Sequence, residues 1–171
     1  MGQGDGLTLI KSLIASDSIM VHRHSGLQAM RTIPVMKNVM TPFPYAVELQ
    51  SSLADAQALM REHHVRHLPV IDERALAGVL SDRDIKLLLG PDFDYPEPGG
   101  LSVADAYQPE SYTVDLNAPL DMVLLEMAER HVGSVVVTRK GKLAGIFTAT
   151  DACREFGLLL QKRRGGPDEA A

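Results

Sequence analysis

The sequence predicts a mixed α/β (α+β) fold built from two copies of one β-α-β-β-α unit, related by a pseudo-two-fold axis and packed sheet to sheet. Three observations support this prediction. The chain repeats itself at an offset of 67 residues, and each copy alternates strand-like with helix-like runs. A length of 171 residues with 45% hydrophobic side chains also suits one compact domain or two small ones.

The internal repeat is the strongest pattern in the chain. Residues 42–84 align with residues 109–151 without a gap, and 14 of these 43 positions are identical. Chance would match about one position in fifteen at average residue usage. Two copies of so long a unit indicate two supersecondary units packed on one another, because solenoid repeats run to about 20–50 residues.

The first helix of each copy is predicted from apolar residues at helical spacing. In the first copy, the start signal S-x-x-D from Ser52 to Asp55 follows a short extended run at 47–49. In the second copy, Pro119 stands near the helix start. The expected helix faces are Leu53, Ala56, Met60 and His64, and Leu120, Val123, Leu124, Met127 and His131.

Two strand-like runs and a second helix complete each copy. Polar turns separate the runs of each pair, which is typical of hairpins. The expected strands are residues 66–71 and 76–80 in the first copy, and 134–138 and 143–147 in the second. The second helices are expected to begin at Ser81 to Asp84 and at Thr148 to Asp151.

A stretch with three prolines and three glycines, residues 90–100, separates the two copies and indicates a linker. Units of about 55–60 residues bury only about 60% of their unfolded surface, so we expect the copies to pack as one body. The expected organisation is an N-terminal extension at 1–31, a first repeat at 32–89, the linker at 90–100, a second repeat at 101–160 and a tail at 161–171.

Charge and composition narrow the class of protein. The net charge of -5 disfavours a surface built to hold nucleic acid. Cys153 is the single cysteine, so no internal disulfide can form and a reducing compartment is favoured. No apolar run approaches the roughly 20 residues of a membrane-spanning helix, and the N-terminus carries an acid where an export signal carries positive charge. We therefore expect a cytoplasmic protein that does not associate with membranes.

Patterns of catalytic and metal sites are missing from the sequence. It contains no P-loop, no G-x-G-x-x-G and no G-x-S-x-G, so we predict a non-catalytic protein. His22 and His24 have no evident third ligand nearby. His64 and His131 share one repeat position near a helix end, which favours a helix-terminal role. We therefore predict no metal site.

The repeated polar pattern is G-φ-φ-[ST]-x-x-D, where φ is apolar, at residues 78–84 and 145–151. One interpretation is a pair of helix capping boxes, with the hydroxyl and the carboxylate satisfying backbone N–H groups. The other is a pair of nucleotide cradles. A strand that ends at a helix start points free N–H groups outward, which suits phosphate. A carboxylate one turn later can accept hydrogen bonds from a ribose diol.

The duplicated unit, the strand sequence from Val65 to Val70 and the paired G-φ-φ-[ST]-x-x-D segments resemble tandem CBS domains, a pair often called a Bateman module. The resemblance covers about residues 32 to 160. It implies a regulatory, non-catalytic module that binds an adenosine ligand such as AMP, ADP, ATP or S-adenosylmethionine in clefts between the repeats, with no required cofactor. It also implies a homodimer, and a regulated partner protein that the sequence does not identify.

The resemblance assigns roles to particular residues. The residues expected to bind the ribose are Asp84, Asp151, Ser81 and Thr148. Phosphate is expected at Arg66, His67 and Arg83, because arginine presents a fork of donors to anions. The residues expected to contact the edge of the adenine are Ala46 and Thr113 and the preceding Tyr45 and Tyr112.

The second copy departs from the family pattern. Gly133, Ser134 and Thr150 stand opposite Arg66, His67 and Arg83, which predicts one strong nucleotide site and one weak, selective or empty site. Two alternatives remain open. One is an adaptor module with empty clefts that acts through partner binding alone. The other, single-stranded nucleic acid binding through Arg66, Arg83 and the basic tail, is disfavoured by the net charge.

Overall fold

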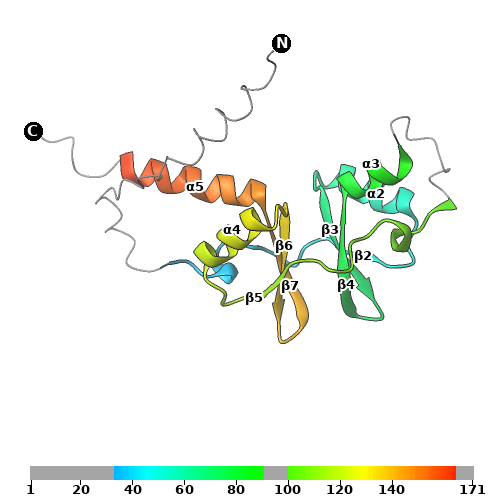
Figure 1. Ribbon diagram of the computed structural model, residues 1–171, viewed down its shortest axis with the longest axis horizontal. Helices are drawn as coiled ribbons and strands as arrows, with labels where there is room; N and C mark the ends of the chain where they lie inside the picture. The colour runs from blue at the N-terminus through cyan, green and yellow to red at the C-terminus, as the bar shows by residue number, and fades with distance from the viewer. Residues whose placement is uncertain (1–32, 91–99, 165–171) are drawn as a thin grey trace, which may run out of the picture. The chain divides into compact units, whose positions relative to one another are not determined.

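The computed structural model describes residues 33–90 and 100–164 of the chain (Figure 1). The predicted N-terminal extension with its histidines, most of the linker and the last residues of the tail lie outside the described residues. The first repeat contains a short 3-10 helix η1 (Met36–Asn38), β1 (Thr41–Pro42), β2 (Val47–Glu48), α2 (Leu53–Glu62), β3 (His67–Asp72), β4 (Ala75–Ser81) and α3 (Asp82–Leu89).

The second repeat has the same element order except that it has no strand matching β1. It contains η3 (Val103–Asp105), β5 (Thr113–Asp115), α4 (Leu120–Glu129), β6 (Ser134–Arg139), β7 (Lys142–Thr148) and α5 (Ala149–Arg164). The predicted strands differ from the observed ones by about a residue at each end. The mixed α/β fold with two β-α-β-β-α units is therefore confirmed.

The two sheets repeat one another in register. One sheet has the order β2-β3-β4 and the other β1-β7-β6-β5. Val47 of β2 pairs in parallel with Val70 of β3, and the matching Val114 of β5 pairs with Val137 of β6. Pro69 is tolerated in β3 because β2 pairs only with the two residues that follow it, so the missing N–H does not interrupt that ladder.

Each repeat has its own apolar core, and β4 of one sheet contacts β7 of the other. α2 buries Leu53, Ala56 and Met60, and α4 buries Val123 and Met127. The first core also takes in Leu68, Val70, Leu80, Ile85 and Leu89, and the second Val135, Val137 and Phe147.

The prediction that the two helix faces extend to His64 and His131 was wrong. Both residues lie just beyond the helix end, both are exposed, and their φ angles are 53° and 55°. A residue in this left-handed conformation cannot continue a right-handed helix, so each histidine terminates its helix. Their helix-terminal position, by contrast, agrees with the sequence interpretation.

The repeats exchange their first segments. Residues 33–43, here called the first exchanged segment, join the second repeat: Thr41 pairs with Ile146, the N–H of Met36 donates to the carbonyl of Ala118 at 3.0 Å, and Met36 is buried in the second core. Two distant parts of the chain are thus joined by backbone hydrogen bonds.

The exchange is reciprocal. Residues 100–108, the second exchanged segment, join the first repeat. The N–H of Leu53 donates to the carbonyl of Leu101 at 2.8 Å, and Val103 is buried in the first core. The backbones of Val79 and Gln108 exchange hydrogen bonds of 3.1 and 2.8 Å. Neither repeat has a complete core without a segment from the other.

The exchange explains the glycines of the repeated motif. A Cβ placed on Gly78 would collide with the carbonyl of Gln108 in the second exchanged segment, and a Cβ on Gly145 would lie 2.9 Å from the carbonyl oxygen of Thr41 in the first. The glycine leaves room for a crossing backbone at each site.

The longest described helix, α5, ends in the basic residues Lys162, Arg163 and Arg164, which complement the negative end of the helix dipole. Within the part of the chain that the structure describes, no helix is both long and apolar enough to cross a membrane.

We expect Gly78→Ala to destabilise the fold by about 1–3 kcal/mol, because the new methyl group would push the second exchanged segment away from β4. Gly157→Ala is the control. Its Cβ would project from α5 into open space, and alanine stabilises a helix interior by roughly 0.5–1 kcal/mol relative to glycine. Urea unfolding of both variants measures the difference, and equal stabilities would contradict the close approach.

Candidate functional site

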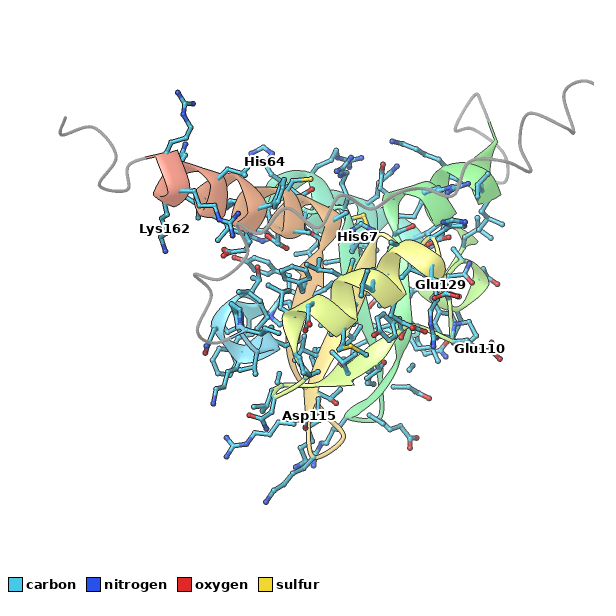
Figure 2. The ribbon with its side chains drawn as sticks, turned by 60° about the vertical axis from the view of Figure 1, so that its left-hand side comes forward. His64, His67, Glu110, Asp115, Glu129 and Lys162 are labelled. Atoms are coloured by element: carbon cyan, nitrogen blue, oxygen red, sulfur yellow. The ribbon has the colours of Figure 1, made fainter. Side chains whose placement is uncertain are left out.

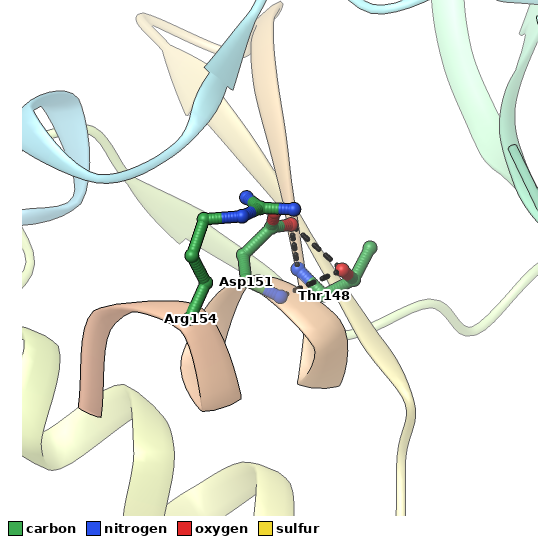
Figure 3. A network of polar contacts seen from close by, with 3 residues as sticks. All are labelled: Thr148, Asp151 and Arg154. Atoms are coloured by element: carbon green, nitrogen blue, oxygen red, sulfur yellow. Dashed lines mark hydrogen bonds and ion pairs between the residues drawn. The ribbon is translucent and has the colours of Figure 1, made fainter. Parts of the chain in front are cut away.

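The site is built at two strand-to-helix junctions, where β4 runs into α3 and β7 runs into α5. At the first, the N–H of Ser81 donates to Oδ2 of Asp84 at 2.9 Å and the N–H of Asp84 donates to the Ser81 hydroxyl at 3.2 Å. At the second, the N–H of Thr148 donates to Oδ2 of Asp151 at 2.9 Å and its hydroxyl donates to the same oxygen at 2.7 Å (Figure 3). The predicted capping interactions are therefore present at both junctions.

Capping uses one oxygen of each carboxylate. Oδ2 of Asp84 and of Asp151 accepts from the residue just before the helix, Ser81 or Thr148. Oδ1 of Asp84 accepts a long 3.3 Å bond from the Gln108 amide, whereas Oδ1 of Asp151 accepts from Nη1 of Arg154 at 2.7 Å. A carboxylate oxygen has two lone pairs, so each Oδ1 keeps acceptor capacity. Capping and ligand binding are therefore compatible roles for one residue.

One cavity of about 830 Å³ joins the two junctions. Residues of both repeats line it, and they include all the predicted site residues except Ala46 and Thr113. Those two each follow a lining tyrosine, and the prediction for them rests on the family resemblance alone. The predicted residues on the wall are Tyr45, Arg66, His67, Ser81, Arg83, Asp84, Tyr112, Thr148 and Asp151.

The charges around the cavity are mixed. Arg66, Arg83 and Arg154 line it together with the carboxylates of Asp82, Asp84, Glu110 and Asp151. Asp82 is paired with Lys86 one helical turn away. Arg154 is paired with Asp151. The guanidinium groups of Arg66 and Arg83, together with the donors that Arg154 does not use for Asp151, are the cationic groups that can meet an anionic ligand beside the Glu110 carboxylate.

His67 is the basic side chain on the cavity wall whose pKa is shifted from its ordinary value. Burial lowers the pKa of the His67 imidazole, the nearby Arg66 guanidinium lowers it further, and the carboxylates of Asp84 and Asp82 act in the opposite direction. The ring lies near Gly133, where an added Cβ would stand 3.5 Å from Nε2. Figure 2 shows His67 towards the middle of the drawn side chains, whereas Lys162 and Asp115 lie at the periphery.

Each lining tyrosine rests against a residue at the end of the neighbouring helix. The rings of Tyr45 and His63 are stacked, with centroids 3.6 Å apart and planes 9° from parallel. The guanidinium carbon of Arg130 lies 4.8 Å from the centre of the Tyr112 ring. Burial and the Glu126 carboxylate raise the pKa of the Tyr112 hydroxyl, whereas Arg130 lowers it. These supports hold both aromatic faces in place.

Sequence reasoning missed several of these residues. His63 and Arg130 occupy matching repeat positions but differ in type, and Arg154 stands opposite Leu87. Identities between the two repeats therefore do not include any of these three residues. The spacing does contain a usable pattern. Arg154 lies three residues after Asp151 on one helix, a separation that brings side chains together.

No group of three or more histidine, cysteine, aspartate or glutamate side chains gathers to hold a metal ion within residues 33–90 and 100–164. Cys153 is exposed on α5 and has no disulfide partner.

The fold and the cavity together define a duplicated α/β module whose two strand-to-helix junctions share one cavity. The family model for the CBS domain matches residues 36–90 and 103–157, so the chain belongs to the CBS-domain family and contains two copies of the domain.

Three similar proteins support the assignment. Hypoxic response protein 1 of Mycobacterium tuberculosis (strain ATCC 25618 / H37Rv) is 32% identical over 122 residues, which cover 70% of this chain and 83% of that protein. The crystal structure of CBSX2 in complex with AMP matches with a TM-score of 0.65 and 27% identity over 74% of this chain and 98% of that chain. The CBS domain of the bacterial CNNM/CorC family Mg2+ transporter in complex with ATP matches with a TM-score of 0.62 and 30% identity, over 72% and 87%.

The lowered pKa of His67 makes the free energy of unfolding depend on pH. Its pKa is lowered from 6.5 in the folded chain, so below about pH 6.5 the unfolded chain binds a proton that the folded chain does not. Stability should therefore fall as the pH falls through 6.5. We expect His67→Gln to flatten this loss between pH 7.5 and 5.5 in urea titrations. His131→Gln, which removes an exposed histidine, is the control. An unchanged slope in the His67 variant would contradict the assignment.

Proposed function

We propose that this chain is a regulatory, non-catalytic module that binds an adenine nucleotide in the cavity shared by its two CBS domains. The observation that carries the proposal is the single cavity that brings together two capping-box aspartates, three arginines and two supported tyrosines. Each Oδ1 can accept from a ribose hydroxyl, and the guanidinium groups can neutralise phosphate. Two of the similar structures are described as complexes with AMP and with ATP, which supports this ligand class.

Regulation requires that the ligand bind two states of the module unequally. The cavity wall is contributed by both repeats, and each repeat holds a segment exchanged from the other. A nucleotide that contacts both walls would therefore favour one arrangement of the two repeats. A regulated partner protein would bind one arrangement of the repeats more tightly than the other.

We further propose that the chain works as a homodimer in the cytoplasm. Large apolar side chains remain exposed on three helices: Leu87 on α3, Met122 and Leu125 on α4, and Phe156 on α5 are 61–71% exposed. A second copy that packs against these helices would cover them. Light scattering should then give twice the chain mass of 18.6 kDa, and the mass of one chain would contradict the dimer.

The ligand class is tested by replacing the two aspartates one at a time. We expect Asp84→Ala and Asp151→Ala each to weaken AMP binding by roughly 1–3 kcal/mol in calorimetry, because each loses acceptors for the ribose. Each should also lose about 1 kcal/mol of stability as a helix cap.

Asp105→Ala is the matched control. Oδ2 of Asp105 accepts from the N–H and from the hydroxyl of Ser102 at the start of η3, both at 2.8 Å, and neither residue lines the cavity. This variant should lose stability without losing affinity. If AMP, ADP, ATP and S-adenosylmethionine all fail to raise the melting temperature of the intact chain, the nucleotide proposal is wrong and the adaptor alternative gains support.

A further inference from the structure

The two halves of the cavity differ in the side chain that reaches Oδ1 of the capping aspartate. In the first half it is the neutral amide of Gln108, 3.3 Å from Oδ1 of Asp84. In the second half, Arg154 donates through Nη1 to Oδ1 of Asp151 at 2.7 Å (Figure 3). The matching position in the first half is Leu87, which is 71% exposed and is absent from the cavity wall. The second half therefore carries a positive charge directly beside Asp151, the predicted acceptor of the ribose diol, and the first half has no such charge at the matching position.

The burial of Asp151 explains why a cation stands there. Asp151 is the one buried charged residue of residues 33–90 and 100–164, with 8% of its surface exposed, whereas Asp84 is only partly buried. A buried carboxylate is costly unless it is paired and hydrogen-bonded. The ion pair with Arg154 meets that need and keeps the guanidinium at the cavity wall.

The ion pair leaves most of the guanidinium free. Arginine has five N–H donors. Among the nitrogen atoms of the Arg154 guanidinium, Nη1 alone donates a hydrogen bond to a described residue. The Arg154 side chain is 60% exposed, so these remaining donors are accessible to a ligand. Oδ1 of Asp151 likewise keeps a lone pair for a hydroxyl.

We propose that Arg154 selects the charge of the ligand in the Asp151 half, favouring an adenosine that carries an anionic 5′ group over one whose 5′ group is neutral. This inference rests on the proposed nucleotide function. While Asp151 accepts from the ribose, the free donors of Arg154 hold the 5′ phosphate in a charge-assisted, forked interaction. A neutral 5′ group gains nothing from this contact.

Two ligands that differ only at the 5′ position test the proposal, namely AMP and 5′-methylthioadenosine. Calorimetry is done in an Asp84→Ala background, which weakens binding in the first half so that the Asp151 half dominates the signal. We expect AMP to bind more tightly than 5′-methylthioadenosine. Arg154→Leu, which installs the residue of the first repeat, should reduce the ratio of the two affinities by about 10-fold.

Two further variants separate selection from structure. Arg154→Lys keeps the charge without the fork of donors and should retain part of the preference for AMP. Arg163→Leu removes a cation from the end of the same helix, away from the cavity wall, and should leave the ratio unchanged. If Arg154 only neutralises Asp151, Arg154→Leu will lower the melting temperature without changing the ratio.

The outcomes distinguish this inference from the proposed function. If the intact chain binds neither ligand, the nucleotide function itself fails. If the intact chain binds AMP but the Asp84→Ala background binds neither ligand, the Asp151 half is empty and the role of Arg154 is overturned. The same holds if the ratio is equal with and without Arg154.

Discussion

The reciprocal exchange of segments is the constraint on which the rest of the structure depends. Residues 33–43 complete the second core and residues 100–108 complete the first, so the two repeats share backbone hydrogen bonds as well as a surface. The motif glycines 78 and 145 lie where these segments cross. Because each crossing lies a few residues before a strand-to-helix junction, the exchange also positions the two junctions around one cavity.

The two interpretations of the repeated motif turn out to describe different atoms of the same residues. Oδ2 of Asp84 and of Asp151 belongs to the helix cap, and Oδ1 of each is directed to other partners. A carboxylate fixed by its own helix loses little conformational freedom when a ligand binds, which favours affinity. The cap is therefore a means of preorganising the site as well as of ending a strand and starting a helix.

The sequence predicts most of the fold because its patterns are local. Apolar spacing, turn residues and the start signals at Ser52, Ser81 and Thr148 give the helices and strands nearly to the residue. The exchange has no such pattern, since Thr41 and Ile146 are distant in the chain. Comparing the repeats finds shared residues such as Asp84 and Asp151 but hides Arg154, which one repeat lacks. His64 and His131 fit a helical pattern, yet their positive φ angles end the helices.

The central claim is that the oxygens left free by the caps hold the ribose diol of an adenine nucleotide. Calorimetry that compares AMP with its 2′,3′-dideoxy analogue tests it most directly, because the two ligands share the adenine and the phosphate and differ only in the groups that meet Asp84 and Asp151. We expect the analogue to bind at least about 10-fold more weakly, the loss of a hydrogen bond to a charged group. Equal affinities would contradict the claim.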